Sequence, residues 1–243
     1  MLKLFTSQKI FIGSILSKFF IYLLGDKKRV IKRNTISYEI DLNEGIDLGI
    51  FLNIKNERKI FNIKKILNEK SEMIFVDIGS NVGSVALPLA HQFKSSKIYA
   101  VEPTFYAYKK LLKNVKLNPN LKNRIIPLNY FVSNKAKPST VHSSWNFNKA
   151  EKKHHIHLGS LKKINNKKII SLDNLFKKAK HKIDFIKLDV DGFEYEVLKS
   201  GEKIIKRNKP VIHIEFAPYL HKEYGYSSNK LIDLIKSKFD YDF

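Results

Sequence analysis

Five short apolar runs in the central and C-terminal parts of the chain have the length and composition of buried strands. They cover residues 73–78, 97–101, 125–129, 185–190 and 210–216. Apolar residues at helical spacing follow the first run from Val82 to Phe93, and similar segments follow the second, fourth and fifth runs. Strands that alternate with helices are typical of a parallel sheet covered on both faces. We therefore expect an α/β fold with a doubly wound, mostly parallel sheet, in which the run containing Pro127 lies at an edge because proline cannot donate to a ladder.

The N-terminal part of the chain shows alternation of apolar and polar residues instead. Two such series lie at residues 36–42 and 46–52, and Asn43-Glu44-Gly45 between them has the composition of a turn. This pattern predicts a β-hairpin with one solvent-exposed face. A helix is predicted over residues 58–67. We interpret residues 1–72 as an extension in front of a core domain that comprises residues 73–243.

The first 26 residues predict an amphipathic helix that stops at Gly25. Its expected apolar face consists of Ile12, Leu16, Phe19, Phe20, Leu23 and Leu24. Lys18 interrupts a run that is shorter than the about 20 apolar residues of a membrane span, and no small-residue cleavage site for secretion follows. The face either packs on the protein or lies on a membrane surface, with Lys27-Lys28-Arg29 at the headgroups. We expect a cytoplasmic protein and leave membrane association open.

The formal charge of +22 suggests an anionic partner at first sight. The basic residues are spread along the whole chain, however, and no helix-turn-helix, RNA-binding sheet or zinc-finger pattern is present. Nucleic acid is therefore not the expected partner. His154, His155 and His157 lie close together in the polar segment 133–168, but no acid or cysteine at ligand spacing accompanies them. We expect no metal site there, and nothing in the spacing of the acids elsewhere demands one.

The first strand of the core leads into a turn that contains two glycines. Asp77 precedes Gly79, and Gly83 opens the helical segment. In an open parallel sheet, ligands dock at such strand-to-helix turns, and glycine lets a ligand approach the backbone closely. Glu102 ends the second strand about 20 residues after the last glycine, the usual position of an acid that binds ribose. The pattern indicates a cofactor that carries a nucleoside.

The composition of the turn distinguishes between two kinds of cofactor. Dinucleotide sites use Gly-x-Gly-x-x-Gly to place pyrophosphate on a helix N-terminus, whereas this chain has Gly79-x-x-x-Gly83. Asp77 would repel a pyrophosphate and attract an ammonium group. S-adenosylmethionine carries a ribose and an ammonium group but no phosphate, so we expect it to be the cofactor.

Four motifs of the core resemble the FkbM-family methyltransferases. They are residues 76–83, 101–103, 171–175 and 186–194. The resemblance covers residues 75–215 and implies a Rossmann-like class I methyltransferase core. It also implies a set of cofactor-binding residues: Asp77, Gly79, Ser80, Asn81, Gly83, Glu102 and Pro103. Asp191 stands where the family more often has Glu. Methyltransferases of this class usually continue into a closing pair of antiparallel strands, so the end at Tyr241-Asp242-Phe243 predicts a short or truncated C-terminal side.

Three acids near the ends of the last two core strands are candidates for catalysis. Asp189 and Asp191 end one strand on the same face, and Glu215 lies near the end of the other. The family resemblance implies methyl transfer to a hydroxyl oxygen of a glycan or other small acceptor. Asp189 is the expected proton acceptor, because it follows the strand next to the cofactor turn. Two alternatives stay open: a catalytically silent binding module with the same fold, and a nucleotide-cofactor oxidoreductase.

Overall fold

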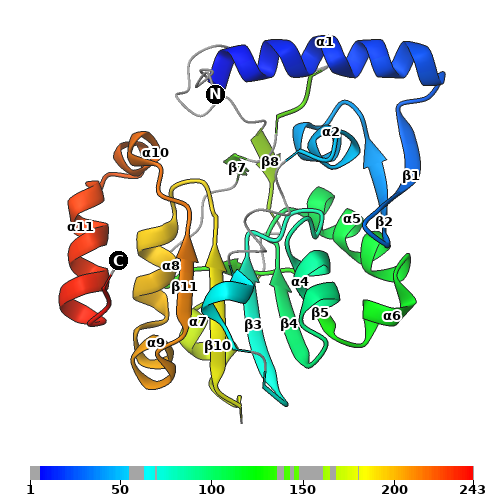
Figure 1. Cartoon of the computed structure of the whole chain (residues 1–243). Coiled ribbons are helices and arrows are strands. Elements are labelled where there is room, and N and C mark those ends of the chain that lie inside the picture. Colours follow the sequence, from blue (N-terminus) through cyan, green and yellow to red (C-terminus); the bar gives the residue numbers. More distant parts are fainter. Residues whose placement is uncertain are drawn as a thin grey trace.

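The structure of the chain is a computed structural model that describes residues 6–54, 63–68, 70–135, 140–142, 145–147, 161–164, 168–179 and 181–242. Within these residues, five parallel strands form the central sheet in the order β11-β10-β3-β4-β5. Their bounds are β3 (Met73–Ile78), β4 (Ser96–Val101), β5 (Ile125–Leu128), β10 (Ile183–Leu188) and β11 (Val211–Ile214). The chain starts the sheet at its centre and adds strands first to one side and then to the other (Figure 1). This arrangement confirms the predicted doubly wound α/β fold.

Helices cover both faces of the sheet, and β3 divides the apolar core between them. Alternate residues of β3 enter different clusters: Phe75 packs with Phe93 and Phe185, and Val76 lies in the other cluster with Ile186. The helices α4 (Ala86–Gln92), α5 (Phe105–Lys116) and α6 (Pro119–Lys122) follow strands of one half of the sheet. In the other half, α7 (Leu172–Leu175) precedes β10. The segments that follow β10 and β11 are α8 (Glu194–Ser200), α9 (Glu202–Asn208), α10 (Pro218–Glu223), α11 (Ser228–Asp233) and the π-helical segment η1 (Leu234–Lys238). Because every residue of β3 is buried, this strand is the centre of the domain.

The edge position predicted for the proline-containing run is confirmed. β5 pairs only with β4 among the described strands, with Pro127 opposite Ala100. An edge strand has one row of backbone groups without a ladder partner, so the missing N–H of proline costs nothing on that side.

A hairpin is present in the N-terminal part, but its strands differ from the prediction. β1 (Lys28–Arg33) pairs antiparallel with β2 (Ile36–Asp41) through a turn in which Asn34 and Thr35 have φ of 45° and 71°. The second predicted strand, over residues 46–52, was wrong. Residues Gly45–Phe51 form the helix α2, which buries Leu48 and Ile50. Alternation over so few residues does not separate a strand from a short helix that is buried on more than one side.

Two asparagines attach the hairpin to the core: Asn114 of α5, and Asn118, which precedes α6. Asn114 accepts the Glu39 N–H at 2.8 Å and donates to the Val82 carbonyl at 2.8 Å. Asn118 accepts the Ser37 N–H at 2.9 Å and donates to the Ser37 carbonyl at 2.8 Å. These bonds satisfy backbone groups of β2 on the edge that faces away from β1. The hairpin is thus held beside the helix that follows β4.

The predicted N-terminal helix is present as α1 (Thr6–Leu24) and ends before Gly25, which has a φ of 71°. Leu16, Phe20 and Ile21 pack on the core, whereas Phe19 and Leu23 are exposed. The apolar side chains are therefore not confined to one face. By length and composition alone, the stretch Ser7–Leu24 is long and apolar enough to cross a membrane.

The segment 133–168 is described only in parts. β7 (Thr140–His142) pairs antiparallel with β8 (Leu161–Lys163), and β6 (Phe131–Val132) pairs parallel with β9 (Ile169–Ile170). The three histidines at 154, 155 and 157 lie outside the described residues, and so do residues 58–62 of the helix predicted over residues 58–67. Residues 63–66 of that prediction are helical.

Candidate active site

The turn after β3 is held against two neighbouring strands. The N–H groups of Gly79 and Ser80 both donate to the Val101 carbonyl at 3.0 Å, and the Ser80 hydroxyl donates to the Asp77 carbonyl at 2.8 Å. A Cβ on Gly79, whose φ is 78°, would lie 1.9 Å from the Asp189 carbonyl oxygen. Glycine is required there because the loop after β10 touches the turn. That the turn also admits the methionine part of the cofactor stays a prediction.

The second glycine has a different neighbour. A Cβ on Gly83, whose φ is 87°, would lie 2.9 Å from Leu111 of α5 and 3.1 Å from Leu87 of α4. Gly83 thus permits close packing between the turn and the helix that follows β4. The contact of Gly83 with the cofactor stays a prediction, because this packing does not test it.

Glu102 lies beside the turn, where its spacing from the glycines predicted it. Its carboxylate is 5% exposed and accepts the Asn81 N–H at 3.0 Å and the Thr104 N–H at 2.9 Å. The Thr104 hydroxyl donates to the same carboxylate at 2.5 Å. Burial raises the pKa of Glu102, while the bonds from Thr104 and Asn81 oppose the rise. Glu102 therefore joins the turn after β3 to the end of β4, and its contact with ribose stays a prediction.

Asn129 supports the same region and was missed by sequence analysis. Its side-chain amide donates to the Glu102 carbonyl at 2.8 Å and to the Pro103 carbonyl at 3.2 Å. Asn129 is buried directly after β5. The sequence contained one signal for it: Asn129 is a polar residue at the end of the apolar run 125–129, and a buried amide needs hydrogen-bond partners.

A buried lysine connects the turn with the candidate catalytic loop. Lys187 of β10 lies opposite Asp77 of β3 in the sheet, and its Nζ is 3.3 Å from Asp77 Oδ1 and 3.3 Å from Asp189 Oδ2. The ammonium also donates to the Gly79 carbonyl at 3.0 Å. Burial lowers the pKa of Lys187, but the charges of Asp189 and Asp77 outweigh this and raise it, so Lys187 remains a cation.

These contacts place Asp77 in a setting that the sequence did not indicate. Its side chain is 0% exposed, and the positive charge next to it belongs to Lys187. Sequence analysis missed Lys187, although a lysine within the apolar run 185–190 was a signal, because a buried charge needs a partner. The ammonium-binding role of Asp77 stays a prediction.

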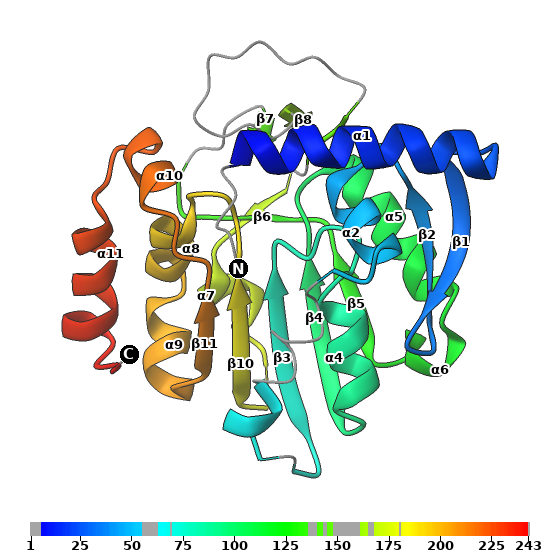
Figure 2. The same ribbon diagram turned by 45° about the horizontal axis from the view of Figure 1, so that its top comes forward.

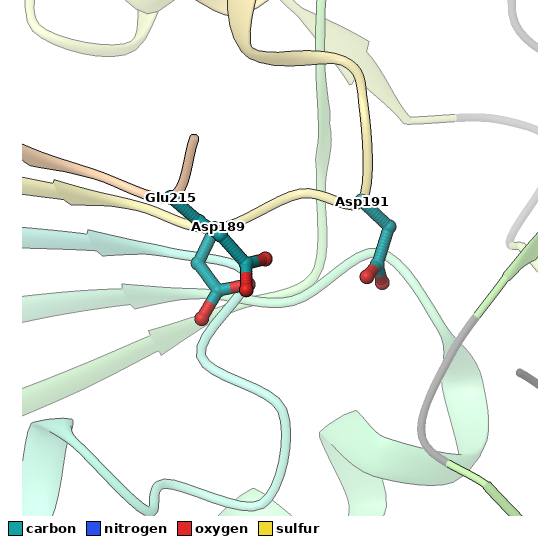
Figure 3. A group of neighbouring side chains, drawn as sticks. All are labelled: Asp189, Asp191 and Glu215. Carbon is teal, nitrogen blue, oxygen red and sulfur yellow. The ribbon is translucent and has the colours of Figure 1, made fainter. Parts of the chain in front are cut away.

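The three acids proposed for catalysis lie together at the strand ends. Asp189 and Asp191 follow β10, and Glu215 follows β11; one carboxylate oxygen from each lies within 4.8 Å of the others. Figure 3 shows all three carboxylates directed to the same side. Like charges at this separation repel one another unless a proton or a cation lies between them. Oxygen ligands of this kind suit Mg²⁺ or Ca²⁺, and the expectation that the protein holds no metal stays untested.

Buried side chains fix the loop that carries Asp191, whose φ is 52°. Glu194 is 1% exposed and accepts the N–H groups of Val190 and Gly192 at 3.1 and 3.2 Å. The Tyr226 hydroxyl donates to the Gly192 carbonyl at 2.6 Å. Glu194 belongs to the motif at residues 186–194, so the sequence indicated it. Nothing in the sequence indicated Tyr226, which is 34 residues away from Gly192.

These elements define a class of protein. The order of the sheet reverses between β3 and β10, and ligands of doubly wound folds bind at that position, outside the carboxyl ends of the strands. A glycine turn after the first strand and an acid after the second suit a nucleoside with no phosphate. The combination is that of a Rossmann-like methyltransferase, whose cofactor is S-adenosylmethionine. Glu102, Asn81 and the turn at residues 79–83 are the groups that would hold it.

Comparison with known proteins identifies the family. The family model described as "Methyltransferase FkbM domain" matches residues 77–243, which is more than half of the chain. The chain therefore belongs to the FkbM methyltransferase family. No curated protein matches it.

Several solved structures share features of the fold. M. jannaschii TYW2 in complex with AdoMet is 23% identical with a TM-score of 0.32, over 42% of this chain and 43% of that one. P. horikoshii TYW2 in complex with MeSAdo is 21% identical with a TM-score of 0.35, over 50% and 51% of the two chains. A SAM-dependent methyltransferase from Aquifex aeolicus is 15% identical with a TM-score of 0.40, over 74% and 78%. The match thus spans about half of each TYW2 chain, and such distant likenesses carry no argument about activity.

Removal of the Lys187 charge should destabilise the protein strongly. Lys187→Met leaves Asp77 fully buried without a counter-charge, which costs about 3–5 kcal/mol. The free energy of unfolding from urea denaturation measures this loss. Lys113→Met is the matched control, because the side chains of Lys113 and its ion-pair partner Glu39 are 61% and 30% exposed, and exposed pairs contribute about 0–1 kcal/mol. The double variant Lys187→Met/Asp77→Asn should recover part of the loss. Equal stabilities for Lys187→Met and Lys113→Met would contradict the account.

Loss of the Glu102 carboxylate should weaken cofactor binding. A hydrogen bond to a charged group contributes about 1.5–3 kcal/mol, so Glu102→Ala should raise the Kd for S-adenosylhomocysteine at least tenfold in calorimetry. Since Glu102 also holds the Asn81 and Thr104 N–H groups, the variant should unfold at a lower temperature. Thr104→Val is the control: it removes one bond to Glu102 but keeps the carboxylate, and it should bind like the parent. If both variants bind like the parent, Glu102 is not the ribose ligand.

Proposed function

We propose that this methyltransferase transfers a methyl group to a hydroxyl oxygen of a glycan or another small hydroxylated acceptor. The observation that supports this most directly is the convergence of Asp189, Asp191 and Glu215 within 4.8 Å. The three acids lie at the strand ends next to the turn expected to hold the cofactor. Carboxylates at this position can accept hydrogen bonds from an acceptor hydroxyl and remove its proton.

The chemistry assigns separate parts to cofactor and protein. S-adenosylmethionine, when bound, supplies a methyl group on a positively charged sulfur. The protein has to orient an acceptor oxygen and take the proton that this oxygen loses as it forms its bond to carbon. Asp189 is the proposed proton acceptor, because it follows the strand next to the turn. Lys187 holds Oδ2 of Asp189 at 3.3 Å and so restricts the orientation of its carboxylate.

The two other acids have supporting parts in this proposal. Asp191 belongs to the loop fixed by Glu194 and Tyr226 and is placed to orient the acceptor hydroxyl. The Glu215 N–H donates to the Leu188 carbonyl at 2.8 Å, which holds it next to the end of β10. Family membership favours methyl transfer over a nucleotide-cofactor oxidoreductase. Residues 1–72 are proposed to cover the front of this site as an extension of the core.

Substitution of Asp189 should separate the chemical step from cofactor binding. A positioned proton acceptor contributes a factor of about 10²–10⁴, so Asp189→Asn should lower kcat at least a hundredfold. Its Kd for S-adenosylhomocysteine should stay close to that of the parent. The assay follows labelled methyl groups from S-adenosylmethionine into a panel of hydroxylated glycans. Asp173→Asn is a control for the loss of a carboxylate outside the site, since Asp173 caps the α9 backbone at Ile204.

Three outcomes would change the proposal. Loss of cofactor binding in Asp189→Asn would make Asp189 a cofactor ligand. Complete inhibition by a chelator, reversed by Mg²⁺, would show that the three acids hold a metal. Binding of S-adenosylhomocysteine without transfer to any acceptor in the panel would favour a catalytically silent module.

A further inference from the structure

The outward side of α1 is covered with large apolar side chains. On a helical wheel they lie on the side opposite the residues that pack on the core. Their exposed fractions are Phe11 67%, Ile12 42%, Ile15 53%, Phe19 53%, Tyr22 89% and Leu23 62%. An exposed apolar surface formed by neighbouring residues marks a binding surface. We call these six residues the outer face of α1.

The opposite side of α1 is fastened to the domain. Phe20 packs against Phe51 of α2 with ring centroids 5.0 Å apart, and the buried Ser17 hydroxyl donates to Asn43 at 3.3 Å. Gly13 lies so close to Phe147 that a Cβ would be 2.7 Å from its ring. A helix held in this way lies along the protein, and it cannot cross a bilayer at the same time.

Basic residues adjoin the outer face. Lys18 lies on the exposed side of α1, and the exposed residues Lys27 and Lys28 follow the end of the helix, close in sequence to Val30, which is 59% exposed. Arg29 has a different task, since it donates to the Leu24 and Asp26 carbonyls at the end of α1. Apolar residues flanked by lysines match a surface with an acyl interior and anionic headgroups.

We propose that the outer face of α1 binds the surface of an anionic bilayer, with Lys18, Lys27 and Lys28 at the headgroups. The helix lies flat in the interface and does not span it. Charge complementarity favours this occupant over a second copy of the chain, because a second copy would bring the same lysines and a formal charge of +22 to the contact.

The position of α1 relates the proposed membrane contact to the candidate active site. α1 runs across the end of the molecule to which the strands of the sheet point (Figures 1 and 2). The acid cluster lies at those strand ends, and directly after Glu215 the aromatic residues Phe216 and Tyr219 are 46% and 49% exposed. A membrane bound to α1 would face this side of the protein. The hydroxylated acceptor is therefore carried by a lipid; this part rests on the proposed function.

Vesicle flotation tests the membrane contact. The purified full-length chain should float with vesicles of phosphatidylcholine and phosphatidylglycerol at low salt, and should remain at the bottom with phosphatidylcholine alone. High salt should reduce the bound fraction at least tenfold. The variant Ile15→Gln/Phe19→Gln/Tyr22→Gln should bind at least tenfold more weakly, with an unchanged unfolding temperature. Ile66→Gln/Leu112→Gln replaces residues that are 64% and 43% exposed outside α1, and it should float like the parent.

Several results would overturn the inference. One is absence of flotation with anionic vesicles, and another is equal flotation of the triple α1 variant and the parent. A third is binding that high salt does not release, because such binding would indicate insertion across the bilayer. A parent dimer that the triple α1 variant converts to a monomer would assign the outer face to a second copy. Methyl transfer to lipid-linked and to soluble glycans is measured separately: flotation without any transfer contradicts the proposed function and leaves the membrane contact intact.

Discussion

The contact between Lys187 and the two aspartates organises the candidate active site. One ammonium group, 5% exposed, lies 3.3 Å from the carboxylates of both Asp77 and Asp189 and donates to the Gly79 carbonyl. It thereby joins the first strand of the sheet, the glycine turn and the end of β10. Since a buried ion is costly without its partners, the three groups hold one another in position.

The site depends on the topology of the sheet as much as on its residues. β3 and β10 are neighbours because the chain returns across the sheet after β5, and this return brings Asp189 onto the turn at Gly79. β11 then adds Glu215 from the far side, while Glu102 adds a carboxylate from β4. Cofactor-binding and catalytic candidates therefore come from four different strand ends, which meet only in the folded protein. All these strand ends point to the side of the molecule along which α1 runs (Figure 1). A membrane bound to α1, as proposed, would therefore lie on the side of the candidate active site.

Sequence predicts the parts of this arrangement that depend on local pattern. The strand, glycine turn and helix from Met73 to Gln92 follow from apolar periodicity, and the place of Glu102 beside the turn follows from its spacing. Contacts between distant segments were not predictable in this way. Lys187 meets Gly79 across 108 residues of sequence, and Tyr226 reaches the catalytic loop from beyond β11. Residues 46–52 were misassigned because a short buried helix and a strand can show the same alternation. The contacts that α2 makes come from distant segments, such as the ion pair between Asp47 and Lys110 of α5.

A crystal structure of the protein with S-adenosylhomocysteine tests the central claim most directly, namely that the strand ends of β3, β4 and β10 form the cofactor and transfer site. The account predicts ribose hydroxyls within hydrogen-bonding distance of Glu102, and the sulfur on the side of Asp189, Asp191 and Glu215. A ligand whose ribose lies away from Glu102, or whose sulfur faces away from the three acids, would contradict it.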